Sequence, residues 1–230
     1  MTEKPKTHPL NPLHSTVMDY SSLSVLGRVA CESLIGSRVR SVVSPDGDDI
    51  IFSFDISPAK NSSSGFDSWI FSADPVLFRM HPWLGELPDK RVKSHFVDVA
   101  SHHLGGAMVV SVELIPFERI IEIGFRRRDF AGDETVYSFI AELMGKYSNL
   151  ILLDSERTII ASWKSVHSYQ SRVREVRAGK EYMPVPQQDK IAPWEFSESE
   201  WKQFISSADF DATLEKHLMK TFRGMSPLWV

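Results

Sequence analysis

The chain has 230 residues, of which 42% are hydrophobic and 24% charged, a balance typical of a folded soluble protein with a sizeable core. Its net charge of −4 excludes a uniformly basic nucleic-acid-binding chain. No apolar run approaches the ~20 residues that a membrane-spanning helix needs, so we expect no membrane partner. The single cysteine excludes an internal disulfide framework and a cysteine-rich zinc site.

The amino-terminal part of the chain predicts a tail followed by a helix. Residues 1–17 contain three prolines among polar residues and no apolar stretch, which indicates a flexible tail rather than a secretory signal. Residues 20–35 place their apolar side chains on one helical face, and Asp19 or one of the serines that follow can serve as the N-cap. Cys31 lies beside that face, so we expect it to be buried as a small apolar residue.

Alternating apolar and polar residues predict antiparallel strands over most of the remaining chain. A Pro-Asp-Gly-Asp turn joins strands over 38–43 and 49–56. We expect further strands over 69–73, 76–81, 107–115, 119–125, 135–143, 149–153 and 158–162, and helices over 90–104, 197–206 and 212–222. This order predicts an α+β fold, with an antiparallel β-sandwich or partial barrel flanked by helices.

The most distinctive stretch is ELMGKYSNLILLD at residues 142–154. It predicts a hairpin whose polar turn, 145–149, leads into an exit strand buried on both faces. The stretch also resembles the E-L-M-G-(K/R)-x-S-N-(L/I)-(I/V)-L segment of the NFACT amino-terminal domain. That domain opens the ribosome-associated quality-control factors, and the spacing around Tyr147 is nearest to its cyanobacterial and plastid branch.

Further segments resemble the same family in the same order along the chain. Residues 72–81 are similar to its S-A-H-P-S-x-x-R-x-H strand, with Asp74 in place of the histidine. Residues 171–186 are similar to its S-R-x-R…G-x-x-Y-x-P-P region, and residues 220–228 look like the end of the domain. The resemblance implies one NFACT-like domain over 18–230, with a fold similar to the amino-terminal domain of formamidopyrimidine-DNA glycosylases.

Full members of the family continue into a helix-hairpin-helix, a coiled coil and a second NFACT domain. None of these follows within this sequence. The chain is therefore expected to be either an excised domain or a naturally truncated protein, and the sequence leaves both open.

The resemblance also implies a functional site. The family's dipeptide for engaging aminoacyl-tRNA, usually Asp-Arg, falls on Glu118-Arg119, where the longer glutamate moves the carboxylate outward by roughly 1.5 Å. Arginine can pair with phosphate or stack on a base, and the acid can orient it. Asp19 matches an acidic position of bacterial members, and Arg172 and Arg174 could track RNA phosphates. Each assignment has an alternative. Glu118-Arg119 could be a solvated charged pair, Asp19 a helix N-cap, and Arg172 and Arg174 solvated loop charges.

The function that the resemblance implies is RNA and ribosome binding. The module would engage aminoacyl-tRNA on the large ribosomal subunit with an obstructed peptidyl-tRNA, and would support template-free carboxy-terminal tailing of stalled nascent chains. Because peptidyl transfer belongs to the ribosome, we expect no catalytic residue, no metal and no cofactor. The expected location is the cytoplasm, or the plastid stroma in a photosynthetic eukaryote.

Two other functions stay open. Some bacterial members carry the label "fibronectin-binding", which would make the chain an adhesion protein. A DNA glycosylase-like enzyme would instead need a proline amine at the mature amino terminus as its nucleophile, and the chain has Thr2 there.

Overall fold

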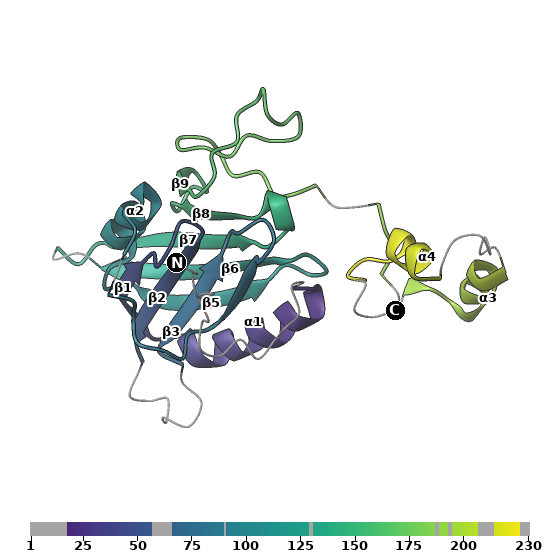
Figure 1. Cartoon of the computed structure of the whole chain (residues 1–230), viewed down its shortest axis with the longest axis horizontal. Coiled ribbons are helices and arrows are strands. Elements are labelled where there is room, and N and C mark those ends of the chain that lie inside the picture. Colours follow the sequence, from purple (N-terminus) through teal and green to yellow (C-terminus); the bar gives the residue numbers. More distant parts are fainter. Residues whose placement is uncertain are drawn as a thin grey trace, which may run out of the picture.

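The computed structural model describes residues 18–56, 66–89, 91–128, 131–186, 189–192, 195–206 and 214–225. The fold is α+β, as predicted: nine antiparallel strands form one open sheet in the order β4-β3-β2-β1-β5-β6-β7-β8-β9, and the helices lie outside it (Figure 1). The predicted tail, 1–17, lies outside the described residues.

The strands are β1 (Arg38–Val43), β2 (Asp49–Asp55), β3 (Ser68–Ser72), β4 (Arg79–Pro82), β5 (Met108–Leu114), β6 (Ile120–Arg128), β7 (Glu134–Glu142), β8 (Asn149–Leu153) and β9 (Ile159–Ser162). The helices are α1 (Tyr20–Leu34), α2 (His95–Leu104), α3 (Glu198–Ser206) and α4 (Leu214–Thr221), and the 3-10 turn η1 (Gly145–Tyr147) joins β7 to β8. The predicted elements are all present, with small differences at their ends.

Each of the two largest differences from the prediction is explained by particular hydrogen bonds. The strand expected over 76–81 begins at Arg79, because the backbone N–H groups of Val76 and Leu77 donate to the Asp74 side chain and form a turn first. The helix expected over 90–104 begins at His95, because the N–H of Val92 donates to a carbonyl after β1 and holds the chain extended.

The open sheet bends so far that its two halves pack face to face. β2 and β7 lie four steps apart in the strand order (β2, β1, β5, β6, β7), about 19 Å in a flat sheet. The ring centroids of Phe52 on β2 and Phe139 on β7 are nevertheless 4.9 Å apart, and Phe71 on β3 lies 5.0 Å from Phe139. These rings form the inner core of one continuous sheet. The expected likeness to the glycosylase fold stays a prediction.

Helix α1 packs along β5 at one side of the sheet (Figure 1). A Cβ atom placed on Gly27 would lie 3.7 Å from Ile121 Cδ1, so this glycine allows close approach of the helix. Ala30 and Leu34 continue the buried face. Cys31 is only partly buried, so the expectation of a buried cysteine is wrong; it lies one position around the helix from that face.

The distinctive stretch forms the predicted hairpin. All five residues of β8 are buried, with Leu150 and Leu152 in the inner core. Ile151 and Leu153 point the other way, into a second cluster that we call the outer cluster; it includes Tyr182 from the irregular segment beyond β9. The exit strand is therefore buried on both faces, as predicted.

The carboxy-terminal segment forms a small aromatic unit beside the sheet (Figure 1). A capping box lies at the start of α3: Glu200 N–H donates to Ser197 Oγ at 3.3 Å, and Ser197 N–H donates to Glu200 Oε2 at 2.7 Å. Phe196, Trp201 and Phe222 pack together with ring centroids 4.9–5.3 Å apart. The helices of this unit thus have their own apolar contacts.

Candidate nucleic-acid interface

The turn between β5 and β6 carries the predicted dipeptide Glu118-Arg119. Its backbone is tied by two hydrogen bonds, from Glu118 N–H to Ile115 O at 3.1 Å and from Ile115 N–H to Ile120 O at 3.0 Å. Phe117 has a φ of 62°, in the left-handed region that costs a residue with a side chain about 1–2 kcal/mol. The dipeptide is therefore presented on a tight and strained turn.

Packing around Phe117 holds this strained turn in place. Its ring centroid lies 5.3 Å from that of Tyr20, the first residue of α1. A Cβ atom on Gly224 would lie 3.3 Å from Phe117 Cδ1 and 3.5 Å from Tyr20 Cδ1. The start of α1, the β5–β6 turn and the carboxy-terminal segment therefore meet at Phe117.

Arg119 is half-buried against an aromatic ring. Its guanidinium carbon lies 5.5 Å from the ring centroid of Phe78, within the range of a cation–π contact, and its carbonyl accepts the N–H of Leu143 at 2.8 Å. Burial lowers the pKa of Arg119, while the nearby Glu118 and Asp19 carboxylates act to raise it. Arginine stays protonated at neutral pH in such surroundings, so the site keeps this positive charge.

Glu118 is surrounded by positive charges from two parts of the chain. Burial raises the pKa of Glu118, and the positive charges of Arg119, Arg223 and Lys190 oppose that shift. Arg223 and Lys190 belong to the carboxy-terminal segment, where Arg223 Nε donates to Lys190 O at 2.5 Å. Neither residue had an expected role from sequence; only the position of Arg223 within the matching segment 220–228 pointed to it.

Asp19 serves as the N-cap of α1. Its Oδ1 accepts the N–H of Ser22 at 2.7 Å, and the residue is 3% exposed, which confirms the capping alternative. Its carboxylate also acts electrostatically on Arg119. The structure thus brings Asp19, Glu118 and Arg119 together, and the cap and the charge partner are the same side chain.

Arg174 is used elsewhere. Its guanidinium makes a paired contact with the fully buried Glu142, with donor–acceptor distances of 2.7 and 2.5 Å, and Tyr182 donates to the same carboxylate at 2.9 Å. Glu142 is the ladder partner of Ile120, which packs in the outer cluster. Since consecutive residues point to opposite faces, Arg119 faces the other side of the sheet.

Arg172 lies on the same irregular segment as Arg174 and is exposed. The structure therefore separates the predicted site residues into a group at the β5–β6 turn and a pair of arginines beyond β9. A phosphate-binding role for Arg172 and Arg174 stays a prediction. The guanidinium of Arg174 already has a buried carboxylate partner.

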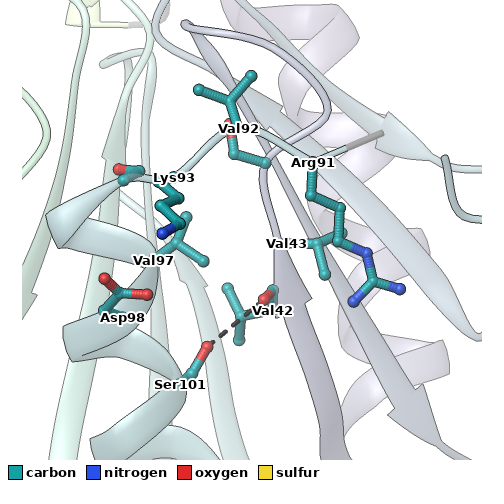
Figure 2. A pocket seen from close by; sticks show the side chains of 10 residues that line it. Val42, Val43, Arg91, Val92, Lys93, Val97, Asp98 and Ser101 are labelled. Atoms are coloured by element: carbon teal, nitrogen blue, oxygen red, sulfur yellow. Dashed lines mark hydrogen bonds between the residues drawn. The ribbon is translucent and has the colours of Figure 1, made fainter. Parts of the chain in front are cut away.

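A shallow pocket lies between the end of β1 and the start of α2 (Figure 2). Val42, Val43 and Val97 line it, and Arg91 and Lys93 stand at its rim. Ser101 Oγ donates to Val42 O at 3.4 Å across its base. None of the predicted site residues lines this pocket, so it is separate from the candidate interface.

The described residues include no group of three or more His, Cys, Asp or Glu side chains placed to hold a metal ion. Within the same part of the chain, no helix is long and apolar enough to cross a membrane.

Residues 31–230 match the model of the family described as NFACT N-terminal and middle domains. The Rqc2 homolog RqcH of Bacillus subtilis (strain 168) is 30% identical over 199 residues, which cover 86% of this chain and 34% of that protein. The Rqc2 homolog RqcH of Streptococcus suis (strain 05ZYH33) is 25% identical over 194 residues, which cover 84% of this chain and 34% of that protein. The chain thus spans about a third of the length of these curated relatives.

Three solved structures share the fold. The N-terminal domain of fibronectin-binding protein PavA from Streptococcus pneumoniae has a TM-score of 0.75 and 23% identity, covering 91% of this chain and 79% of that one. The N-terminal part of the fibronectin/fibrinogen-binding protein from Streptococcus suis gives 0.76 and 24%, covering 91% and 76%. The fibrinogen binding protein from Staphylococcus aureus gives 0.68 and 28%, covering 89% and 69%. With the family match over residues 31–230, the chain belongs to the family of NFACT N-terminal and middle domains.

Proposed function

We propose that this chain is the RNA-binding module of a ribosome quality-control factor. It engages aminoacyl-tRNA on the large ribosomal subunit with an obstructed peptidyl-tRNA, and so supports template-free tailing of the stalled nascent chain. The relatedness to RqcH proteins supports the class. The observation that carries the proposal is the half-buried Arg119, which is held over Phe78 beside two carboxylates, Asp19 and Glu118.

The physical argument starts from partial burial. A guanidinium that has already lost part of its water binds a phosphate or base edge with less further desolvation, and its geometry favours paired hydrogen bonds. Lys190 and Arg223 add positive charge around Glu118. This positive charge attracts a phosphate backbone. The carboxylates orient the guanidinium and can accept hydrogen bonds from base amino groups.

The remaining parts of the proposal follow from this role. The module recognises RNA and performs no bond-making step, so it needs no metal or cofactor. We place it in the cytoplasm, or in the plastid stroma if the chain comes from a photosynthetic eukaryote of the cyanobacterial and plastid branch. Residues 18–230 form the NFACT-like domain in this proposal.

The test is binding of fluorescein-labelled tRNA by the 230-residue chain, measured by fluorescence anisotropy at low salt. Arg119→Ala should weaken binding by roughly 10- to 100-fold, the loss expected for a charge-assisted contact of about 1.5–3 kcal/mol. Arg40→Ala is the matched control, because Arg40 is a half-exposed arginine that pairs with Asp55 and Asp67. Equal effects of the two substitutions would reject the assignment of Glu118-Arg119.

An adhesion function is the second candidate, because solved structures with this fold are named for fibronectin or fibrinogen binding. It predicts that the chain binds immobilised fibronectin and that Arg119→Ala leaves this binding unchanged. The glycosylase-like alternative predicts excision of a damaged base from duplex DNA, with a nucleophile at the amino terminus. Running these assays beside the tRNA titration separates the three functions.

A further inference from the structure

Two loops from distant parts of the chain meet beside Phe78 and expose apolar side chains. One loop joins β3 to β4, and the other is the η1 turn between β7 and β8. A Cβ atom on Gly145 of η1 would lie 3.6 Å from Pro75 O and 3.7 Å from Phe78 Cε1, so the loops are in contact. Together the two loops carry three exposed apolar side chains, which we call the ridge: Val76, Leu77 and Tyr147 are 66%, 48% and 69% exposed.

The backbone of both loops is fixed by buried or local hydrogen bonds. Asp74 Oδ1 accepts the N–H groups of Val76 at 2.7 Å and Leu77 at 2.6 Å, and these bonds lower the pKa of Asp74. In η1, the fully buried Ser148 accepts the N–H of Met144 through Oγ at 2.8 Å. The exposed side chains are therefore presented by ordered turns, as expected of a binding surface.

The buried ring of Phe78 lies between the η1 turn and the candidate interface. Arg119 lies over the Phe78 ring, and Gly145 approaches an edge atom of the same ring. The ammonium group of Lys146 lies 4.9 Å from the ring centroid of Tyr147. An exposed aromatic ring with its own cation is thus carried by the turn that contacts Phe78, the ring on which the Arg119 guanidinium lies.

We propose that Tyr147 is a stacking platform for an unpaired base of the RNA held by Glu118-Arg119, and that Lys146 contacts a neighbouring phosphate. This inference rests on the proposed function. Proteins that bind single-stranded nucleic acid combine aromatic rings, on which bases stack, with cations along the backbone. Bases inside a duplex are already stacked on both faces, so the platform would select a loop, a bulge or a free end.

The size and charge of the ridge favour RNA over a protein partner. Three side chains fall far short of the roughly 800 Å² that each partner buries in a stable protein interface. A single stacked base needs only one exposed ring, and Lys146 and Arg119 supply charge complementary to phosphate.

The test compares labelled tRNA with a fully paired, blunt-ended RNA duplex. Tyr147→Ala should weaken tRNA binding by roughly 5- to 100-fold, the range found for loss of one stacked base, and should leave duplex binding unchanged. Tyr147→Phe keeps the ring and should retain wild-type affinity. The matched control is Tyr169→Ala, since Tyr169 is 81% exposed on another loop. The dependence of tRNA affinity on salt should be the same for Tyr147→Ala and wild type, because stacking releases no counterions.

The outcomes separate the inference from the proposed function. If the unsubstituted chain binds neither RNA, both fail. If tRNA binds and Arg119→Ala weakens it, but Tyr147→Ala behaves like Tyr169→Ala, only the stacking inference is overturned. Loss of binding in Tyr147→Phe would also overturn it, since the ring would not be the cause. Because Tyr147 is 69% exposed, its variants should melt at the wild-type temperature, which checks that folding is intact.

Discussion

Phe117 combines an unfavourable backbone conformation with favourable side-chain packing. Its φ of 62° is a left-handed value, yet its ring contacts Tyr20 and lies against Gly224. Backbone strain persists only where the surrounding structure holds it. Here the strained residue lies in the β5–β6 turn, two positions before Arg119. No local sequence pattern indicated this, because phenylalanine is not a residue that predicts positive φ.

We expect the Phe117→Gly variant to be more stable than the Phe117→Ala variant. Both Phe117→Gly and Phe117→Ala lose the ring, but only alanine keeps the left-handed strain. The free energy of unfolding of the glycine variant should therefore be about 1 kcal/mol higher than that of the alanine variant. Urea titration of both variants measures the difference. If alanine is equal or better, as it is at ordinary positions, the turn is not strained.

Tyr182 should make stability depend on alkaline pH. Burial raises the pKa of Tyr182, with further increase from the Glu142 carboxylate that its hydroxyl contacts. A group with a raised folded-state pKa contributes its full stability below its unfolded value near 10, and this contribution falls as pH rises above that value. Stability should therefore fall by up to about 1.4 kcal/mol per pH unit above pH ~10 on account of this one group.

The substitution Tyr182→Phe isolates that contribution. The variant should be less stable than wild type by about 1.5–3 kcal/mol at pH ~8, because Glu142 loses a hydrogen bond. The difference should shrink as pH rises through about 10 to 11, where only wild type loses stability from this residue. Urea unfolding across this range provides the measurement, and a difference that stays constant with pH would contradict the assignment.

At the scale of elements, the ion pair between Arg174 and Glu142 fastens the irregular segment beyond β9 to β7. Glu142 is completely buried and Arg174 is 13% exposed in its side chain. Removing the cation from a buried pair leaves a carboxylate without its main compensating charge, which typically costs 3–5 kcal/mol. The predicted RNA-binding role would need the Arg174 guanidinium to contact a phosphate, whereas in the structure it pairs with Glu142.

We therefore expect Arg174→Met to lower the free energy of unfolding by about 3–5 kcal/mol, measured by urea titration. The double variant Arg174→Met, Glu142→Gln should recover part of the loss, because the uncompensated charge is gone. Equal instability of the single and double variants would show that the ion pair is not the cause. Arg172→Ala, on the same segment but exposed, should leave stability within ~0.5 kcal/mol of wild type.

Most elements could be predicted because their signals are local. Alternating residues and the Pro-Asp-Gly-Asp turn define β1 and β2, and the ends of β8 agree with the prediction. The late start of β4 depends on the side chain of Asp74, and the late start of α2 on a bond from Val92 to a distant loop. Such interactions decide element ends without changing hydrophobic periodicity.

At the scale of the whole molecule, the sequence left the choice between a sandwich and a partial barrel open. β2, β3, β4 and α2 lie between β1 and β5 in the chain. The two strands nevertheless share one ladder pair, Arg38 with Met108, which makes the sheet continuous. Such a pairing has no local signal. The same is true of Lys190 and Arg223, which reach Glu118 from the carboxy-terminal segment. The location of Glu118-Arg119 itself came from family resemblance rather than from any chemical pattern.

The central claim is that Arg119 contacts RNA phosphate or base at the junction of the sheet and the carboxy-terminal segment. The most direct measurement is the salt dependence of tRNA affinity for wild type and Arg119→Ala. Loss of one phosphate contact should make the slope of log affinity against log salt shallower by about 0.7–0.9, with weaker binding at low salt. Superimposable salt titrations for the two proteins would contradict the claim.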